Sequence, residues 1–128
     1  MVGVSSYIPL LDTPKQLDPG EISALWSQKV KSKLDMLASK LEKRVLISEI
    51  GYRNSSDALY QTWLPHTNAS LDPQVQSAAY AATLSNTLSD PQIAGTFFWG
   101  WDGVDRFSIK DQPAVQTLNK WYSLPQAS

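Results

Sequence analysis

The sequence predicts an α/β fold in which three short strands alternate with three helices. Apolar runs with the length and β-branched or aromatic content of strands lie at 2–8, 44–50 and 93–101. A segment with apolar residues at steps of three and four follows each run, directly or after a loop, and that spacing is typical of an amphipathic helix. Because such alternation favours a parallel sheet with right-handed crossovers, we predict three consecutive βα units.

Composition and charge exclude several classes of protein. The chain has 128 residues, 42% of them apolar and 18% charged, which fits one globular domain with its own core. The net charge is −1 without a basic run, and no segment approaches the roughly 20 apolar residues of a membrane span, so we expect neither nucleic acid nor membrane as a partner. There is no cysteine, and the single His66 lies in a polar loop, so we expect no metal and no cofactor. The compartment cannot be assigned from the sequence.

The first unit begins at the amino terminus with the strand at 2–8, in which Tyr7 lies near the carboxyl end. Asp18 followed by Pro19 is a helix start, with a capping carboxylate and proline at the first helical position. The apolar residues that follow predict one long helix to residue 41: Ile22, Leu25, Trp26, Val30, Leu34, Leu37 and Leu41.

The second unit contains a buried strand at 44–50 and a long polar segment from Arg53 to Leu71. This segment, which includes Trp63, exceeds the usual length of a connection, and loops of that kind are usually functional. Asp72 and the proline after it begin a second helix by the same cap-plus-proline pattern, and Asp90-Pro91 ends it.

The third unit begins with an aromatic strand at 93–101. Side chains alternate along a strand, so Phe97, Trp99 and Trp101 are predicted to face one way and Phe98 the other. We expect both phenylalanines in the core, and the two tryptophans would ordinarily lie there too.

The end of the chain contains one more helix. A loop rich in Asp and Gly covers 102–111, and Gln112-Pro113 begins a helix with Val115, Leu118, Trp121 and Tyr122 as apolar positions. We assign residues 1–124 to one domain and 125–128 to a tail.

Chemically distinctive residues lie at the carboxyl end of each predicted strand. They are Tyr7 in the first unit, Glu49 in the second and Trp99 in the third. Functional groups of parallel sheets gather at this edge. A buried, unpaired carboxylate costs several kcal/mol, so Glu49 is expected in a polar cleft unless it forms a structural ion pair with Arg53 or Arg106.

A Glu, a Tyr able to hydrogen-bond to it and a Trp face together form half of a glycosidase site. The Tyr would orient the carboxylate, and the Trp would stack on the apolar face of a sugar. Retaining glycosidases need a second carboxylate about 5–5.5 Å from the first. The other acids near strand ends lie in loops that give no indication of such a role: Asp12, Asp57, Asp102 and Asp105.

Two segments carry a resemblance to a known family. Val-Leu-Ile-Ser-Glu-Ile-Gly-Tyr-Arg at 45–53 and Ala-Gly-Thr-Phe-Phe-Trp-Gly-Trp-Asp at 94–102 resemble the last part of a clan A glycoside hydrolase, closest to the family 113 β-mannanases and more distantly family 5. The resemblance implies a retaining (β/α)8 barrel (a TIM barrel) acting on β-linked, mannan-like polysaccharide. It assigns Glu49 as the nucleophile, Trp99 as a sugar platform and Tyr7 as the residue that orients the nucleophile.

Four further residues are candidates for substrate contact. Tyr52 and Arg53 belong to the motif around the nucleophile, Trp101 follows the platform residue, and Trp63 lies in the long loop.

The resemblance also implies that the chain corresponds to strands 6–8 and helices 6–8 of the barrel. The acid/base Glu of the family lies on the fourth strand, which this sequence does not contain. The chain is therefore expected to be a fragment, to pair with another polypeptide or to self-associate, and to be inactive alone. The alternative is a non-catalytic carbohydrate-binding or structural module derived from a barrel. A flavodoxin-type domain is disfavoured because no Gly-rich phosphate loop follows a strand.

Overall fold

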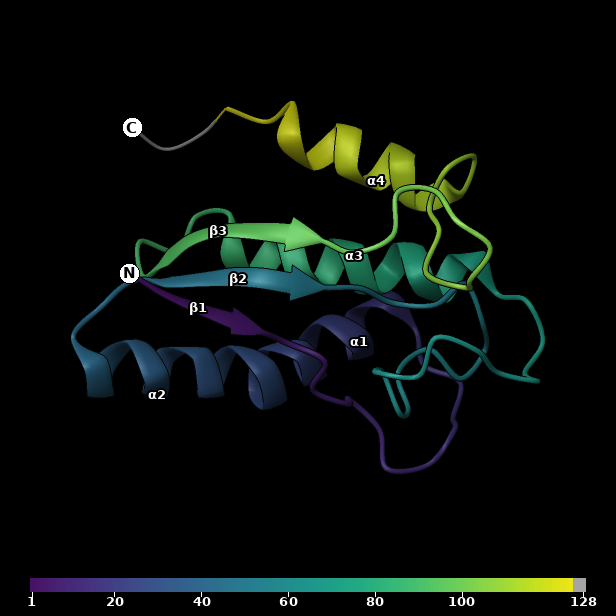
Figure 1. Cartoon of the computed structure of the whole chain (residues 1–128), viewed down its shortest axis with the longest axis horizontal. Helices are drawn as coiled ribbons and strands as arrows, with labels where there is room; N and C mark the ends of the chain where they lie inside the picture. Colours follow the sequence, from purple (N-terminus) through teal and green to yellow (C-terminus); the bar gives the residue numbers. More distant parts are fainter. Residues whose placement is uncertain (126–128) are drawn as a thin grey trace.

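The computed structural model describes residues 1–125 and confirms the predicted fold class (Figure 1). Three strands, β1 (Val2–Ser5), β2 (Val45–Ile50) and β3 (Ile93–Phe98), form one parallel sheet in the order β1-β2-β3. β1 and β3 end three residues before the predicted boundaries. The side chains predicted to carry chemistry in the first and third units therefore lie just beyond the strands.

The first helical segment starts where the sequence predicts but is not one uniform helix. It consists of α1 (Pro19–Trp26), a π-helical turn η1 (Ser27–Lys31) and α2 (Ser32–Leu41). The carboxylate of Asp18 accepts a hydrogen bond from the amide of Glu21 at 2.8 Å, which satisfies one of the free donors of the first turn.

The other two helices also start at the predicted prolines. They are α3 (Pro73–Thr87), which Asp72 caps through the amide of Val75 at 3.3 Å, and α4 (Pro113–Tyr122). None of the helices in residues 1–125 is long and apolar enough to cross a membrane. Of the predicted tail, residues 126–128 lie outside the described part of the chain.

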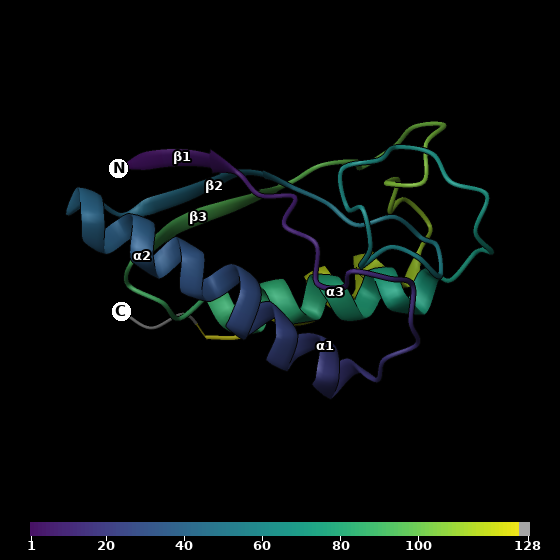
Figure 2. The ribbon, with the colours of Figure 1, turned by 90° about the horizontal axis from the view of Figure 1, so that it is seen from below.

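The helices α1, α2 and α3 lie on one side of the sheet, and the other face is uncovered (Figure 2). On the covered face, Val45 and Ile47 are fully buried, and the ring of Phe98 stacks on Tyr80 of α3 with centroids 4.4 Å apart. Phe97, on the opposite face, is 63% exposed, as its alternation with Phe98 requires. The prediction that Phe97 lies in the core is therefore wrong, because α1, α2 and α3 all cover the other face of the sheet.

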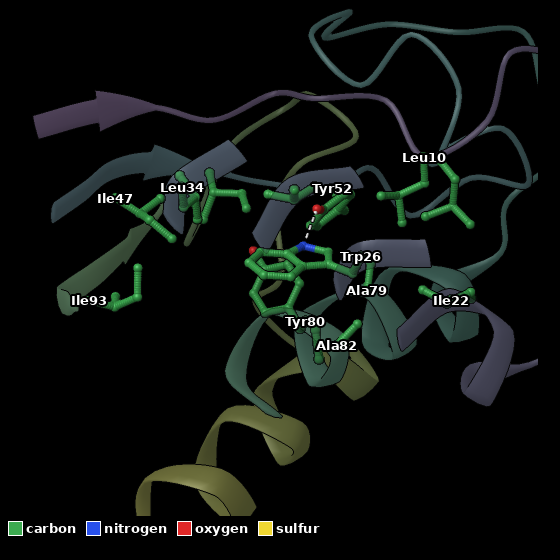
Figure 3. Packing of buried hydrophobic residues seen from close by; sticks show 14 of the residues in the cluster. Leu10, Ile22, Trp26, Leu34, Ile47, Tyr52, Ala79, Tyr80, Ala82 and Ile93 are labelled. Carbon is green, nitrogen blue, oxygen red and sulfur yellow. Dashed lines mark hydrogen bonds between the residues drawn. The ribbon is translucent and has the colours of Figure 1, made fainter. Parts of the chain in front are cut away.

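The core lies between the sheet and the helices, around an aromatic centre (Figure 3). Trp26 is fully buried, and its indole Nε1 donates a hydrogen bond to the hydroxyl of Tyr52 at 2.9 Å. Ala79 and Ala82 of α3 let this helix pack closely against α1. This core fixes the base of the segment that carries Tyr52.

A groove of about 940 Å³ runs along the free edge of β3. It is lined by strand residues Ile93 to Phe97, the end of α3, Arg44 and Tyr122. In the part of the chain that the structure describes, no strand pairs with β3 on this side. A parallel strand and its helix are the elements that cover such an edge in a closed barrel.

Candidate functional site

The loops that follow the three strands extend beyond the same edge of the sheet (Figures 1 and 2). This edge brings together the two residues that the sequence singled out for a carboxylate site. The hydroxyl of Tyr7 donates a hydrogen bond to Oε1 of Glu49 at 2.5 Å. The amide of Ser6 donates to the main-chain carbonyl of Glu49 at 2.8 Å, which holds the two segments side by side.

A bulge in β2 places Glu49 in this position. Ile47 and Ile50 are both fully buried, although residues three apart in a regular strand face opposite sides. Their partners on β3 are only two apart, and on β1 consecutive residues pair with Ile47 and Glu49. Thus β2 carries one extra residue at Ser48–Glu49. Bulges of this kind re-aim side chains next to functional sites, and sequence periodicity alone did not predict this one.

Neither arginine considered as a structural partner pairs with Glu49. Arg53 forms its ion pair with Asp57 at 3.3 Å, and Arg106 donates to the carbonyl of Ala69 at 3.5 Å. Within residues 1–125, Glu49 has no ion pair, and Tyr7 is its only side-chain hydrogen-bond partner. The carboxylate is thus held from one side and is free to interact on the other.

Tyr7 is held as a neutral hydrogen-bond donor. Its ring packs edge-on against Phe107, with centroids 6.1 Å apart and planes at 75°. Burial, with the hydrogen bond and the charge of Glu49, raises the pKa of the Tyr7 hydroxyl well above its ordinary value. At neutral pH the hydroxyl therefore keeps its proton and directs it at the carboxylate.

Two glycines determine how the third strand ends. The amide of Trp99 donates to the carbonyl of Ile50 at 2.7 Å, and a Cβ at Gly51 would lie 3.0 Å from the carbonyl oxygen of Trp99. Gly100 has a φ of 96°, and a Cβ there would lie 2.6 Å from the carbonyl oxygen of Phe107. The chain turns sharply after Trp99 and then packs on the segment that contacts Tyr7.

The tryptophans predicted to contact a sugar are all exposed. Trp99, Trp101 and Trp63 are 52%, 60% and 53% exposed, so the alternative that the first two belong to the core does not hold. Within residues 1–125, Trp63 has no hydrogen bond to Glu49, but its neighbour Thr62 donates a hydrogen bond to the carbonyl of Tyr7. The long loop thus contacts the site through Thr62, which nothing in the sequence had indicated as a site residue.

Tyr52 and Arg53 do not occupy the positions expected of substrate ligands. Tyr52 is 2% exposed and accepts the bond from Trp26, and burial raises its pKa to about 12. Arg53 is 1% exposed, and its guanidinium faces the main chain of the loop that follows it. Both side chains point into the protein, where they contribute to packing and to the loop, and direct substrate contact stays a prediction for these two residues.

The loop acids have separate partners. Asp102 pairs with Lys110 at 3.0 Å on the surface, and Asp57 accepts hydrogen bonds from the hydroxyls of Ser55 and Thr67. Within residues 1–125, no group of three or more His, Asp or Glu side chains is placed to hold a metal ion.

Asp105 differs from the other loop acids because it lies near the candidate pair. Its Oδ1 accepts the amide of Phe107 at 2.9 Å, and its charge contributes to the raised pKa of Tyr7. Asp105 is therefore close to Tyr7, but within residues 1–125 it has no hydrogen bond to Glu49 and is not placed as its acid partner.

Comparison with solved structures identifies the fold. A family 113 β-1,4-mannanase superimposes on 97% of this chain with a TM-score of 0.73 and 17% sequence identity. The fold is that of part of a family 113 β-mannanase. A complex of a family 113 β-1,4-mannanase matches with a TM-score of 0.72 and 16% identity over 97% of this chain. The Alicyclobacillus acidocaldarius β-mannanase in complex with ManMIm gives 0.70 and 17% over 95%.

The chain spans about two fifths of the length of these structures, with coverage of 39%, 39% and 38% of their chains. A comparison with known protein families found no match, and a comparison with curated protein sequences found none either. The resemblance to family 113 β-mannanases that the sequence predicts is confirmed as a likeness of fold. The three βα units are accordingly part of a barrel.

Proposed function

We propose that this chain is the carboxyl-terminal portion of a retaining glycoside hydrolase that acts on β-linked, mannan-like polysaccharide. The observation that supports this most directly is the hydrogen bond between Tyr7 and Glu49, at the carboxyl edge of a sheet with the family 113 fold. Functional groups of (β/α)8 barrels lie at that edge.

In this proposal Glu49 is the nucleophile. One carboxylate oxygen attacks the anomeric carbon, the bond from that carbon to the leaving oxygen breaks, and a second carboxylic acid protonates the leaving oxygen. Tyr7 donates to Oε1, so it fixes the carboxylate plane and leaves Oε2 to attack. Water then cleaves the glycosyl–enzyme ester with the second group as base, which restores Glu49.

The exposed tryptophans supply the sugar platform. Trp99 lies directly after β3, where its amide bonds to the carbonyl of Ile50 next to Glu49, and Trp101 lies two residues further on. An indole face gives the apolar C–H face of a pyranose a large contact area at little entropic cost. Trp63, which is exposed in the long loop, is a further candidate for sugar contact.

The second carboxylate and the cover of the open sheet face come from outside the described residues. The uncovered face around Phe97 and the groove of about 940 Å³ along β3 both fit further strand–helix units of a barrel. Those units belong to a longer chain, a separate polypeptide or a second copy of this one. The isolated chain is expected to lack turnover on polysaccharide, since one carboxylate cannot both attack and protonate.

A substrate with an activated leaving group tests the nucleophile without the missing acid. A 2-deoxy-2-fluoro-β-mannosyl fluoride needs no protonation of its leaving group, and its glycosyl–enzyme ester hydrolyses slowly. Intact-mass spectrometry of the 128-residue chain is expected to show one added fluorosugar, located on Glu49 by peptide mapping. Glu49→Gln should abolish the adduct, whereas Glu42→Gln, at an exposed helix end, should leave it unchanged. An adduct that persists in Glu49→Gln refutes the assignment.

A second experiment supplies the missing units. Co-expression with a polypeptide that provides the other five βα units, including an Asn-Glu at a strand end, is expected to give mannan hydrolysis that Glu49→Gln abolishes. Turnover by the Gln variant equal to that of the unsubstituted chain would exclude Glu49 as the nucleophile.

The alternative is a carbohydrate-binding or structural module without turnover. The observation in its favour is that three tryptophans are exposed while Glu49 has no second carboxylate bonded to it. This function predicts that binding of mannan oligosaccharide, followed by tryptophan fluorescence, is lost in Trp99→Ala and kept in Glu49→Gln. It also predicts no fluorosugar adduct.

A further inference from the structure

We propose that Arg53 and Thr62 are positioning residues for the candidate nucleophile. Arg53 folds the loop of residues 53–71 around its guanidinium, and this loop, through Thr62, fixes the backbone of Tyr7 so that its hydroxyl meets Glu49. The inference deepens the proposed function, because the aim of Tyr7 matters for hydrolysis only if Glu49 is the nucleophile. Its test, however, requires no hydrolysis.

Arg53 is the centre of the loop. Its Nη1 donates to the carbonyls of Gln61 and Leu64 at 2.9 and 2.8 Å. Its Nη2 donates to the carbonyls of Asp57 and Tyr60, both at 2.9 Å, and the Asp57 carboxylate lies 3.3 Å away. Four carbonyls that point at one buried cation cannot do so unless the loop is closed around it. This arrangement uses the planar fork of arginine, which the ammonium of a lysine does not reproduce.

The loop of residues 53–71 is hydrogen-bonded to the segment that follows β1. The carbonyl of Leu59 accepts the amides of both Leu10 and Leu11 at 3.0 Å. Leu10 and Leu59 are 0% and 3% exposed, so these bonds lie in the interior. The hydroxyl of Thr62, which is 1% exposed, donates to the carbonyl of Tyr7.

Tyr7 needs this support because the sheet does not provide it. β1 ends at Ser5, and the last bond of sheet type is the one from the amide of Ser6 to Glu49. Tyr7 therefore lies outside the strand ladder, and its carbonyl is held by a side chain from the second unit instead. The bulge in β2 orients the carboxylate of Glu49, and the loop of residues 53–71 orients Tyr7, which donates to it.

The test uses the 128-residue chain labelled with ¹³C at the ζ carbon of tyrosine. At neutral pH the ζ-carbon shift reports the hydrogen bond of each hydroxyl, and Tyr7→Phe assigns the signal of Tyr7. The shift difference between the unsubstituted chain and Glu49→Gln defines the contribution of the carboxylate. The signal of Tyr52, in the core beside Trp26, is an internal reference for an intact fold.

Thr62→Val keeps the shape of the side chain and removes its donor, whereas Thr62→Ser keeps the donor. Thr62→Val and Arg53→Lys are expected to lose more than half of the defined shift difference at Tyr7, with the Tyr52 signal unmoved. Thr62→Ser is expected to keep most of it. If the valine disturbs the Tyr52 signal, Thr62→Ala replaces it as the variant without a donor.

Two results overturn the inference: a Tyr7 signal in the variant without a donor that matches the unsubstituted chain, or an equal loss in Thr62→Ser. The fluorosugar experiment is independent of both. If the predicted shifts are observed but no adduct forms, the assignment of Glu49 as the nucleophile is refuted, and the positioning role of Arg53 and Thr62 stands. A chain that forms the adduct with unchanged shifts refutes the positioning alone.

Discussion

The two adjacent phenylalanines of β3 provide a direct test of the open sheet face. A phenylalanine side chain buries roughly 200 Å² when fully covered. Phe97 is 63% exposed, so about 75 Å² is covered, and at about 25 cal/mol per Å² its removal costs at most about 2 kcal/mol. Phe98 is mostly covered and stacks on Tyr80 at 4.4 Å, so Phe98→Ala should cost about 4 kcal/mol.

The assay is urea unfolding of the 128-residue chain, followed by circular dichroism at low protein concentration. Both substitutions place alanine in the same strand, so the loss of strand propensity is common to them and the difference of about 2 kcal/mol reports burial. Equal costs for Phe97→Ala and Phe98→Ala would show that both faces are covered in solution. That result would refute the assignment of the open face. When the other barrel units are supplied, the cost of Phe97→Ala should rise toward that of Phe98→Ala.

Two further predictions concern the core and the loop. Tyr52→Phe leaves the buried indole N–H of Trp26 without an acceptor and should lower the free energy of unfolding, measured by urea titration, by about 1–3 kcal/mol. Tyr60→Phe, the control in the loop, should lower it much less. Equal losses in the two variants would contradict a stabilising role for the Trp26–Tyr52 hydrogen bond. Burial opposes ionisation of the Asp57 carboxyl, but hydrogen bonds from Ser55 and Thr67 and the charge of Arg53 hold its pKa below the ordinary value. The ionised carboxylate therefore stabilises the fold above about pH 4. This stabilisation is lost as the pH falls through the lowered pKa. Urea titrations at pH 5 and pH 3 should therefore show a smaller loss of stability in Asp57→Asn than in the unsubstituted chain, and an identical pH dependence would contradict the prediction.

The secondary structure could be predicted because its signals are local. Asp18 and Asp72 cap α1 and α3 as the sequence pattern requires, and both helices begin at the proline that follows the capping residue. Apolar spacing identified Ile22, Trp26 and Val30 as one buried face. The interruption by a π-helical turn leaves that face in place, so the periodicity contained no sign of it.

The fate of an aromatic residue could not be predicted from its type. Phe97 and Phe98 have the same side chain in the same strand, yet one is exposed and the other stacks in the core. The difference depends on which face of the sheet has helices, and that is a property of the whole barrel. A prediction that both lie in the core therefore assumed helices on both faces of the sheet, and residues 1–125 place them on one face only.

The roles of Tyr52 and Arg53 could not be predicted from their place beside Glu49 in the sequence. Residues that follow a strand end can point toward the site or back beneath it. Here Tyr52 turns to Trp26, and Arg53 turns to the carbonyls of its own loop. Both are long-range or loop-wide interactions that no short motif encodes.

The distribution of contacts divides the candidate site into two parts that would depend differently on further barrel units. The hydroxyl of Tyr7 bonds to Glu49 beside the bulge in β2, and Thr62 holds the carbonyl of Tyr7; all of these residues lie within residues 1–125. In the proposed function, the acid partner and the cover over Phe97 come from residues outside this range. Because the first part is held by interactions already formed in this chain, docking of the other units need not reorder it. If the proposed function holds, the cost of assembling the site falls mainly on joining two surfaces, because the orientation of the Glu49 carboxylate is already set in this chain.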